Sequence, residues 1–143
     1  MTLETCLECD FLRSGAPEPP LLRTPHFAVH GKIEIPAVPG WMIIAPLRHV
    51  EQVDALDALE QSELQPLIAR VAAGLRAATP TARVYVCTWN EMLSHLHIHV
   101  IARPPDFPPE RRGAKLFLED PPTDPASRKA GHDVARAVLA TLR

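Results

Sequence analysis

Three histidines at every second position form the most reactive stretch of this sequence. His95, His97 and His99 alternate with apolar residues, several of them β-branched, and this pattern predicts a strand over residues 94–101. Alternate side chains of a strand share a face, so the imidazoles project from one side and the apolar side chains enter the core. Neutral imidazole donates and accepts hydrogen bonds, binds metals and attacks electrophiles. A solvated face with a chance run of histidines is the plainer interpretation, but the regular spacing favours a functional site.

A Cys-x-x-Cys pair near the start of the chain is a second candidate site. Cys6 and Cys9 have the spacing of two thiolates that bind one zinc ion, although a redox pair or two inert buried thiols would have the same spacing. The βαβ pattern that usually surrounds a redox pair is absent here. A tetrahedral zinc site needs two further ligands from elsewhere in the chain. His49, which follows a predicted strand, is of interest for this reason.

Four further elements position these residues. Short apolar or alternating runs predict strands over 26–30, 41–46 and 83–88, and the turn at 89–94 makes the last of them an antiparallel neighbour of the histidine strand. An apolar stripe predicts a helix that begins near residue 58, where Asp57 and Glu60 form a capping box, and ends near residue 78. Pro66 is expected to kink or interrupt this helix. We expect loop over 11–25.

The C-terminal part of the chain is predicted to be irregular at first and then helical. A proline-rich segment extends over about 103–122, and Asp124 followed by Pro125 is a helix start, so a C-terminal helix is expected over about 124–142. No repeat or second domain is evident. We therefore expect a single domain over residues 1–143.

Composition limits the class of protein. The chain has 143 residues, of which 46% are hydrophobic, enough for a globular core. A formal net charge of −2 gives no electrostatic case for binding nucleic acid or an anionic membrane. No window is apolar enough to span a bilayer, the first residues do not resemble a signal peptide, and three cysteines argue against a disulfide framework. These features predict a cytoplasmic protein.

The histidine run matches a known family pattern at every position. His-φ-His-φ-His-φ-φ, where φ is apolar, is the motif of the histidine triad (HIT) superfamily of nucleotide hydrolases and transferases, and residues 95–101 fit it. The Cys-x-x-Cys pair, the segment from Pro39 to His49 (Pro-Gly-x₅-Pro-x-x-His), a helix and the triad also come in the family's order. The chain therefore resembles a HIT protein over about residues 6–103.

The resemblance implies roles for particular residues. In zinc-bearing members, the residues that correspond to Cys6, Cys9, His49 and His95 hold a structural zinc ion. The central histidine, here His97, is the nucleophile that attacks the α-phosphorus of a nucleotide and forms a nucleotidyl-histidine. A backbone carbonyl orients this nucleophile through its other ring nitrogen. The third histidine, here His99, contacts phosphate oxygens or the leaving group.

The chain departs from the family pattern at several substrate-binding positions. Many members have a histidine directly after Pro-Gly, where this chain has Trp41, and residues 89–94 replace the usual Gly-rich, Gln-containing approach to the triad. Asn90 and Glu91 are candidates for positioning substrate. Glu34 is the nearest candidate for the acidic residue that holds ribose, and Phe27 is a candidate for lining the base pocket.

Together these features predict an α+β, HIT-like fold with a mostly antiparallel sheet, one main helix and a C-terminal helix. The resemblance implies a homodimer and a hydrolase or transferase that acts on nucleoside phosphate derivatives, foremost dinucleoside polyphosphates such as diadenosine tetraphosphate and next adenosine phosphoramidates. A catalytically weak nucleotide-binding or regulatory module is the alternative. A third hypothesis makes the three triad histidines the ligands of a catalytic metal, but it leaves the cysteines without a role.

Overall fold

The computed structural model describes residues 6–14, 18–118, 120 and 122–143. Five strands form one antiparallel sheet in the order β1-β2-β3-β5-β4: β1 (Leu21–Arg23), β2 (Phe27–Gly31), β3 (Trp41–Pro46), β4 (Arg83–Cys87) and β5 (Ile98–Arg103). β3 and β5 are both interior strands of this sheet. Their pairing places Trp41 opposite Ile101 and Ile43 opposite His99.

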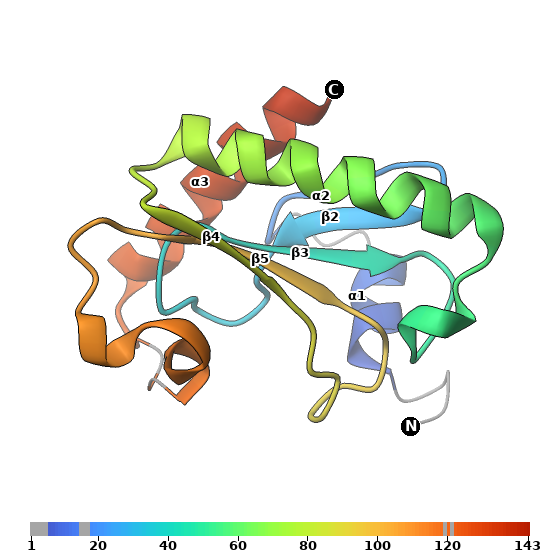
Figure 1. Ribbon diagram of the computed structural model, residues 1–143, viewed down its shortest axis with the longest axis horizontal. Coiled ribbons are helices and arrows are strands. Elements are labelled where there is room, and N and C mark those ends of the chain that lie inside the picture. The colour runs from blue at the N-terminus through green and yellow to red at the C-terminus, as the bar shows by residue number, and fades with distance from the viewer. Residues whose placement is uncertain (1–5, 15–17, 119, 121) are drawn as a thin grey trace.

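Two long helices cover one face of the sheet. α2 (Ala58–Ala78) and α3 (Pro125–Leu142) pack against each other and against the sheet, as Figure 1 shows. Met42, Ile44, Ile98 and Val100 point toward these helices and join the main hydrophobic core, together with Leu67, Val71 and Leu75 of α2. Because side chains alternate across a strand, Trp41, Ile43, His99 and Ile101 lie on the opposite face.

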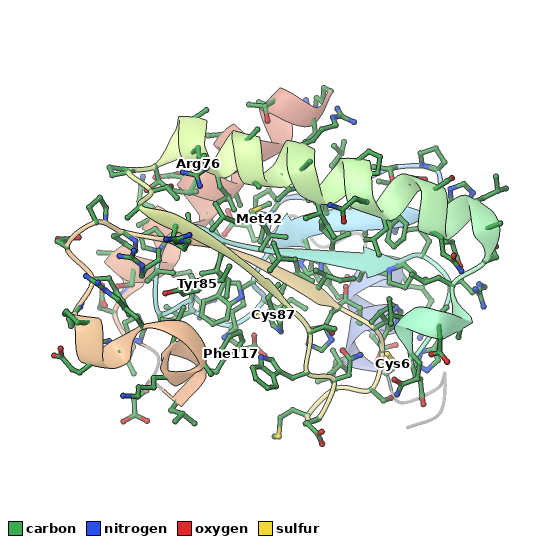
Figure 2. All side chains as sticks on the ribbon, viewed as in Figure 1. Cys6, Met42, Arg76, Tyr85, Cys87 and Phe117 are labelled. Atoms are coloured by element: carbon green, nitrogen blue, oxygen red, sulfur yellow. The ribbon has the colours of Figure 1, made fainter. Side chains whose placement is uncertain are left out.

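That opposite face is covered by short segments from distant parts of the sequence. α1 (Leu7–Ser14) lies against one part of it, and two 3₁₀ turns, Pro109–Arg111 and Gly113–Leu118, lie against another (Figure 1). A second, smaller hydrophobic cluster forms here from Val38, Trp41, Ile43, Ala45, Ile101, Phe107 and Leu116. Figure 2 shows Met42 on the helix side of the sheet and Phe117 on the other. The site therefore lies on the face that α2 and α3 leave uncovered.

The main helix begins as the sequence predicts. The Asp57 carboxylate accepts hydrogen bonds from the backbone N–H groups of Leu59 and Glu60, and the Glu60 side chain accepts one from the backbone N–H of Asp57. Arg48 binds Glu60 through Nε and Nη2, at 3.1 and 2.7 Å. Pro66 lies inside α2 without ending it, so a single helix reaches Ala78. The predicted end of the helix is confirmed.

The glycine before β3 is required by close packing. A Cβ atom at Gly40 would lie 2.7 Å from the Ala102 Cβ, closer than Cβ atoms approach in proteins, and a tight 3.1 Å from Thr79 Cγ2. The carbonyl of Gly40 also accepts a 2.7 Å hydrogen bond from the Ala102 N–H. Gly40 therefore lets the start of β3 lie directly against β5.

Two predictions of local structure are wrong. The predicted loop over 11–25 contains the end of α1 and all of β1. The predicted strand over 94–101 is β5, which begins only at Ile98, so His95 and His97 precede the strand. β4 ends at Cys87, opposite His99, and the pairing of β5 with β3 stops at Ile44, opposite Ile98, although β3 itself continues to Pro46. The Leu96 N–H instead donates to the carbonyl of Val50 at 2.6 Å.

Candidate active site

The central histidine is held by the backbone next to it. His97 Nδ1 lies 2.7 Å from the carbonyl oxygen of His95. A carbonyl can only accept, so Nδ1 carries the proton and donates it, and Nε2 of the neutral ring keeps a free lone pair. His97 is half-buried and lines a cavity of about 660 Å³. This arrangement presents an oriented nucleophile to the cavity.

Two residues after β4 hold the backbone of His97. The Thr88 hydroxyl donates to the carbonyl of His97 at 2.8 Å and lies 2.9 Å from Asn90 Oδ1, which accepts a longer, 3.4 Å hydrogen bond from the His97 N–H. Asn90 has a φ of 53°, a left-handed conformation that asparagine adopts more readily than most residues. Asn90 also lines the cavity, but these contacts make it a support for the nucleophile. Thr88 was not singled out from the sequence.

The third histidine is a largely buried part of the cavity wall. His99 is 7% exposed, and the indole N–H of Trp41 donates to its Nδ1 at 3.0 Å. Phe117 packs edge-on against both rings, with ring centroids 5.2 Å away in each case. Burial, and then the charges of His97 and Lys32, lower the pKa of His99 from its usual value near 6.5 to about 3. His99 is therefore neutral at any pH at which the protein would act.

The cavity in front of these histidines mixes aromatic and charged walls. Trp89 and Phe117 form part of its aromatic wall, and their ring centroids are 5.7 Å apart. Five side chains of charged residue types also line it: Glu8, Lys32, Glu34, Glu91 and Lys115. Glu34 lies 3.6 Å from the ammonium of Lys32, which in turn lies 4.8 Å from the centre of the Trp41 ring. The cavity can therefore accept a ligand that carries both a planar ring and anionic groups.

The sequence-predicted substrate residues have different positions around this cavity. Glu34, Asn90 and Glu91 line it. Phe27, a candidate for the base pocket, is fully buried in the main core on the helix side of the sheet and does not line the cavity, so this prediction is wrong. Its position in β2 determines which face its side chain occupies, and that register is not visible in the sequence.

The sequence also left other cavity residues unassigned, among them Phe117, Lys32 and Lys115. Phe117 belongs to the apolar triplet Leu116–Leu118 within the proline-rich segment. Lys32 follows β2 directly, and Lys115 lies on the 3₁₀ turn over Gly113–Leu118. Phe117 and Lys115 reach the cavity because the 3₁₀ turn lies on the same side of the sheet as His99.

The four predicted zinc ligands converge in one place. Cys6, Cys9, His49 and His95 each present one ligand atom, and these atoms all lie within 4.8 Å of one another. Sulfur to Nδ1 distances are 3.5 Å for Cys6 to His95 and 3.4 Å from Cys9 to each histidine. Two ligands of a tetrahedral zinc ion, one sulfur and one nitrogen, would be roughly 3.6 Å apart. The spacing therefore fits zinc.

The far nitrogens of both histidines are also oriented for metal binding. His95 Nε2 donates to the carbonyl of Pro46 at 3.0 Å, and His49 Nε2 lies 3.3 Å from the Glu51 carboxylate. Such contacts hold Nδ1 unprotonated and aimed at the sulfurs, as in zinc sites. Burial and the neighbouring Cys6 raise the pKa of Cys9 to about 11, so a cation is needed for both thiols to ionise. The donor set fits a closed Cys₂His₂ zinc site.

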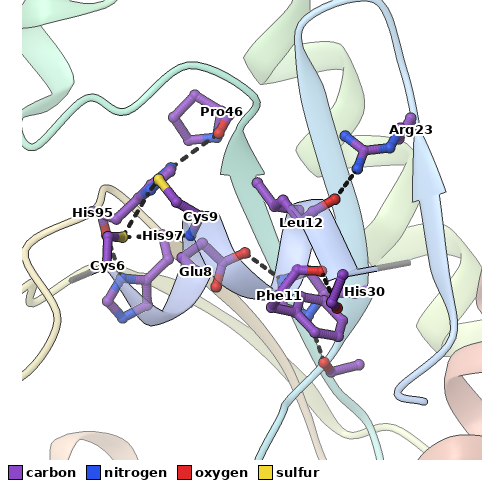
Figure 3. A network of polar contacts seen from close by, with 12 residues as sticks. Cys6, Glu8, Cys9, Phe11, Leu12, Arg23, His30, Pro46, His95 and His97 are labelled. Atoms are coloured by element: carbon purple, nitrogen blue, oxygen red, sulfur yellow. Dashed lines mark hydrogen bonds and ion pairs between the residues drawn. The ribbon is translucent and has the colours of Figure 1, made fainter. Parts of the chain in front are cut away.

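One residue belongs to both sites. His95 directs Nδ1 to the cysteine sulfurs and, through its carbonyl, accepts the hydrogen bond that orients His97 (Figure 3). The position of the nucleophile therefore depends on how firmly His95 is held. Sequence spacing alone placed these residues on one face but did not show this connection.

A buried ion pair attaches α1 to the sheet. His30 Nδ1 donates to the carbonyl of Gly31 at 2.7 Å, and His30 Nε2 lies 2.8 Å from the Glu8 carboxylate (Figure 3). The two ring nitrogens of His30 therefore face a carbonyl oxygen on one side and a carboxylate on the other. Burial alone would raise the pKa of Glu8, but the hydrogen bond to His30 and its charge lower it. This pair, which the sequence did not predict, fixes α1 beside the cavity.

Comparison with known proteins gives the family. The model of the HIT domain matches residues 20–106, more than half of the chain. No curated protein matches the chain significantly in sequence. With the histidine site and the sheet that carries it, this match shows that the chain belongs to the HIT domain family.

Solved HIT structures share the fold. A Hit-like protein involved in cell-cycle regulation from Bartonella henselae superposes with a TM-score of 0.73 at 16% identity, covering 99% of each chain. A hypothetical histidine triad nucleotide-binding protein from Sulfolobus tokodaii gives 0.71 at 17% identity, over 96% of this chain and 95% of that one. A Zn-bound histidine triad family protein from Mycobacterium smegmatis gives 0.69 at 18%, over 97% and 96%. At these identities the likeness establishes the α+β fold alone.

No helix among the described residues combines the length and apolar character that crossing a membrane requires.

Proposed function

We propose that this HIT protein is a nucleotide hydrolase or transferase that acts at the α-phosphate of nucleoside phosphate derivatives through His97. The observation that carries the proposal is the 2.7 Å contact between His97 Nδ1 and the His95 carbonyl, which leaves Nε2 free at the cavity. Nε2 attacks the α-phosphorus, a P–N bond forms, and the bond from phosphorus to the leaving group breaks. The His95 carbonyl stabilises the positive charge that develops on the ring.

The second half of the reaction releases the nucleotide. A water molecule or another acceptor attacks the same phosphorus, the P–N bond breaks, and its electron pair returns to Nε2. The acceptor loses its proton and the leaving group gains one, so the histidine ends as it began. Splitting one difficult displacement into two easier ones is the advantage of the covalent intermediate.

The charges of the cavity support dinucleoside polyphosphates as the first substrate class and adenosine phosphoramidates as the second. Lys32 and Lys115 are cations that would attract a polyphosphate chain, and Trp89 offers a face on which a base stacks. Glu34 and Glu91 repel phosphate. In this proposal they instead accept hydrogen bonds from the ribose hydroxyls.

A structural zinc ion, held by Cys6, Cys9, His49 and His95, completes the proposed protein. Zinc would fix His95 and, through it, the orientation of His97. The hypothesis of a catalytic metal bound by the three triad histidines has no support among the described residues, because His95 Nδ1 faces the sulfurs and His99 Nδ1 is occupied by Trp41.

The proposed assembly is a homodimer in the cytoplasm. β4 is an edge strand with Val86 exposed, so a second copy could extend the sheet there. The three free cysteines are compatible with a reducing compartment. Light scattering coupled to size-exclusion chromatography measures the oligomeric state, and a monomer at micromolar concentration contradicts the dimer.

The experiment compares turnover and intermediate formation in the wild-type protein and a His97→Ala variant. Diadenosine tetraphosphate and adenosine phosphoramidate are supplied in turn, and product is followed by chromatography. The wild type is expected to release AMP, to show a mass increase of one adenylate on His97 after rapid quenching, and to lose both on substitution. Equal turnover by the two proteins contradicts the proposal.

The alternative is a nucleotide-binding module with little or no turnover, and two features favour it. Trp41 stands where many members have a histidine, and Glu91 adds a negative charge at the cavity. Tight AMP binding by calorimetry, without product or adduct in the wild type, would select this alternative.

A further inference from the structure

Trp41 makes a directed contact to the site that its burial does not require. Its side chain is 3% exposed and belongs to the smaller hydrophobic cluster, yet its indole N–H points at His99 Nδ1 from 3.0 Å. Trp41 is paired with Ile101 and His99 with Ile43, so the two side chains lie diagonally on one face of β3 and β5. A diagonal pair in an antiparallel sheet is within reach of a side chain as long as tryptophan.

This contact determines the protonation of the His99 ring. An indole N–H only donates, so His99 Nδ1 must be the unprotonated acceptor, and the proton of the neutral ring is on Nε2. The groups that face His99 are Lys32, His97, Cys87 across from it on β4, and the ring of Phe117. The cation Lys32 opposes a second proton on the ring, in agreement with the lowered pKa described above.

The fixed tautomer places a donor toward the reacting group. The rings of His97 and His99 are 4.9 Å apart in an edge-to-face arrangement, and both line the cavity. A phosphoryl group bound at His97 Nε2 would therefore have the Nε2–H of His99 as a neighbour. A donor held ready before the reaction is worth more than one that must first turn or change tautomer.

We propose, on the basis of the function proposed above, that Trp41 is a positioning residue that holds His99 as the Nε2–H tautomer, so that His99 donates to an oxygen of the phosphoryl group transferred to His97. Trp41 acts through His99 and does not touch the substrate. The donor remains neutral, and it supplies a hydrogen bond without supplying charge.

A purely structural role for Trp41 gives different expectations. If Trp41 only fills space, Trp41→Phe keeps an aromatic ring in the cluster and changes stability alone. Phe107→Leu provides the matched control, because Phe107 belongs to the same buried cluster but does not line the cavity. Both variants loosen the packing, and only one removes the indole N–H.

The first measurement is the ¹⁵N spectrum of the ring nitrogens in protein labelled at histidine, with the His99 signals assigned from a His99→Gln variant. In the wild type and in Phe107→Leu, His99 is expected to show a pyridine-type Nδ1 and a pyrrole-type Nε2. In Trp41→Phe, a mixture of tautomers is expected. A pyrrole-type Nδ1 in the wild type overturns the proposal, and this result does not depend on activity or on the folding of any Trp41 variant.

The second measurement is steady-state kinetics with the preferred nucleotide substrate. Trp41→Phe is expected to lower kcat by roughly 10- to 100-fold, as is typical when the partner that orients an active-site group is removed, while KM changes little. Phe107→Leu is expected to keep kcat near the wild-type value. Unchanged kcat in Trp41→Phe overturns the proposal.

The two proposals fail separately. If the wild type forms no adduct with any nucleotide, the proposed function fails while the tautomer measurement still stands. If the wild type is active and Trp41→Phe retains both the Nε2–H tautomer and kcat, the proposed function stands and the role of Trp41 is refuted.

Discussion

The buried, neutral state of His99 predicts a specific loss of stability in acid. Burial lowers the pKa of His99 most strongly, followed by the charges of His97 and Lys32, and the value falls to about 3. In the unfolded chain the same group titrates near 6.5. Below pH 6.5 the unfolded state therefore binds a proton at His99 that the native state does not bind until the pH approaches 3. The contribution of His99 to stability is fully present above pH 6.5 and is lost as the pH falls toward 3.

The size of this loss follows from the difference between the native and the unfolded pKa of His99. A change from 6.5 to about 3 corresponds to a loss on the order of 4 kcal/mol by pH 3, and about 3 kcal/mol by pH 4. A loss of this size is a large part of the free energy of unfolding of a domain this small. The effect is large enough to measure against other titrating groups.

The assay compares the wild type with a His99→Gln variant. A glutamine carbonyl can accept the indole N–H of Trp41 but has no proton to gain in this range. Urea unfolding at several pH values between 7 and 4, at one fixed zinc concentration, gives the free energy of unfolding of each protein. The carboxylates and the other histidines titrate in both proteins, so their effects cancel in the difference between the two free energies of unfolding.

The expected result is a steeper acid loss in the wild type. Its free energy of unfolding should fall faster than that of His99→Gln by about 1.4 kcal/mol per pH unit between pH 6 and pH 4. Parallel curves over this range would show that His99 is protonated in the native state and would refute the argument.

Three further predictions concern the metal, the close approach of two strands and the helix cap. Metal analysis of the purified protein should find about one zinc ion per chain, and Cys9→Ala should lose it and speed amide exchange in α1. Gly40→Ala should lower the free energy of unfolding by about 1–3 kcal/mol in urea, because its Cβ would lie 2.7 Å from that of Ala102. Asp57→Ala should cost about 1 kcal/mol in the same assay by removing the cap of α2, whereas Asp106→Ala, on an exposed turn, should have little effect.

The sequence by itself determined the elements whose signals are local. The continuous apolar run at Trp41–Pro46 is a strand, and the capping box at Asp57 and Glu60 does begin the main helix. Asp124 caps α3 as expected, with its carboxylate 2.9 Å from the Ser127 N–H. Each of these signals depends on residues within a few positions of one another. The residue types of the zinc site were also visible, because the family order supplied partners that spacing alone did not.

Only the tertiary structure decided where β5 begins and what surrounds its histidines. Strand ends depend on where pairing with a neighbouring strand stops, and β5 begins at Ile98 because its pairing with β3 stops there, opposite Ile44, and β4 already ends opposite His99. The end of α1 and all of β1 lie in a segment that was predicted to be loop, since neither element has a strong pattern and both are stabilised by contacts with distant residues. The alternation of side chains predicted three histidines on one face. In the folded protein, however, each of these histidines contacts a different partner. His95 faces the cysteines, His97 faces the cavity and His99 faces Trp41, which is 58 residues earlier in the chain. Such contacts depend on register and packing across the sheet, which no local pattern in a single sequence specifies.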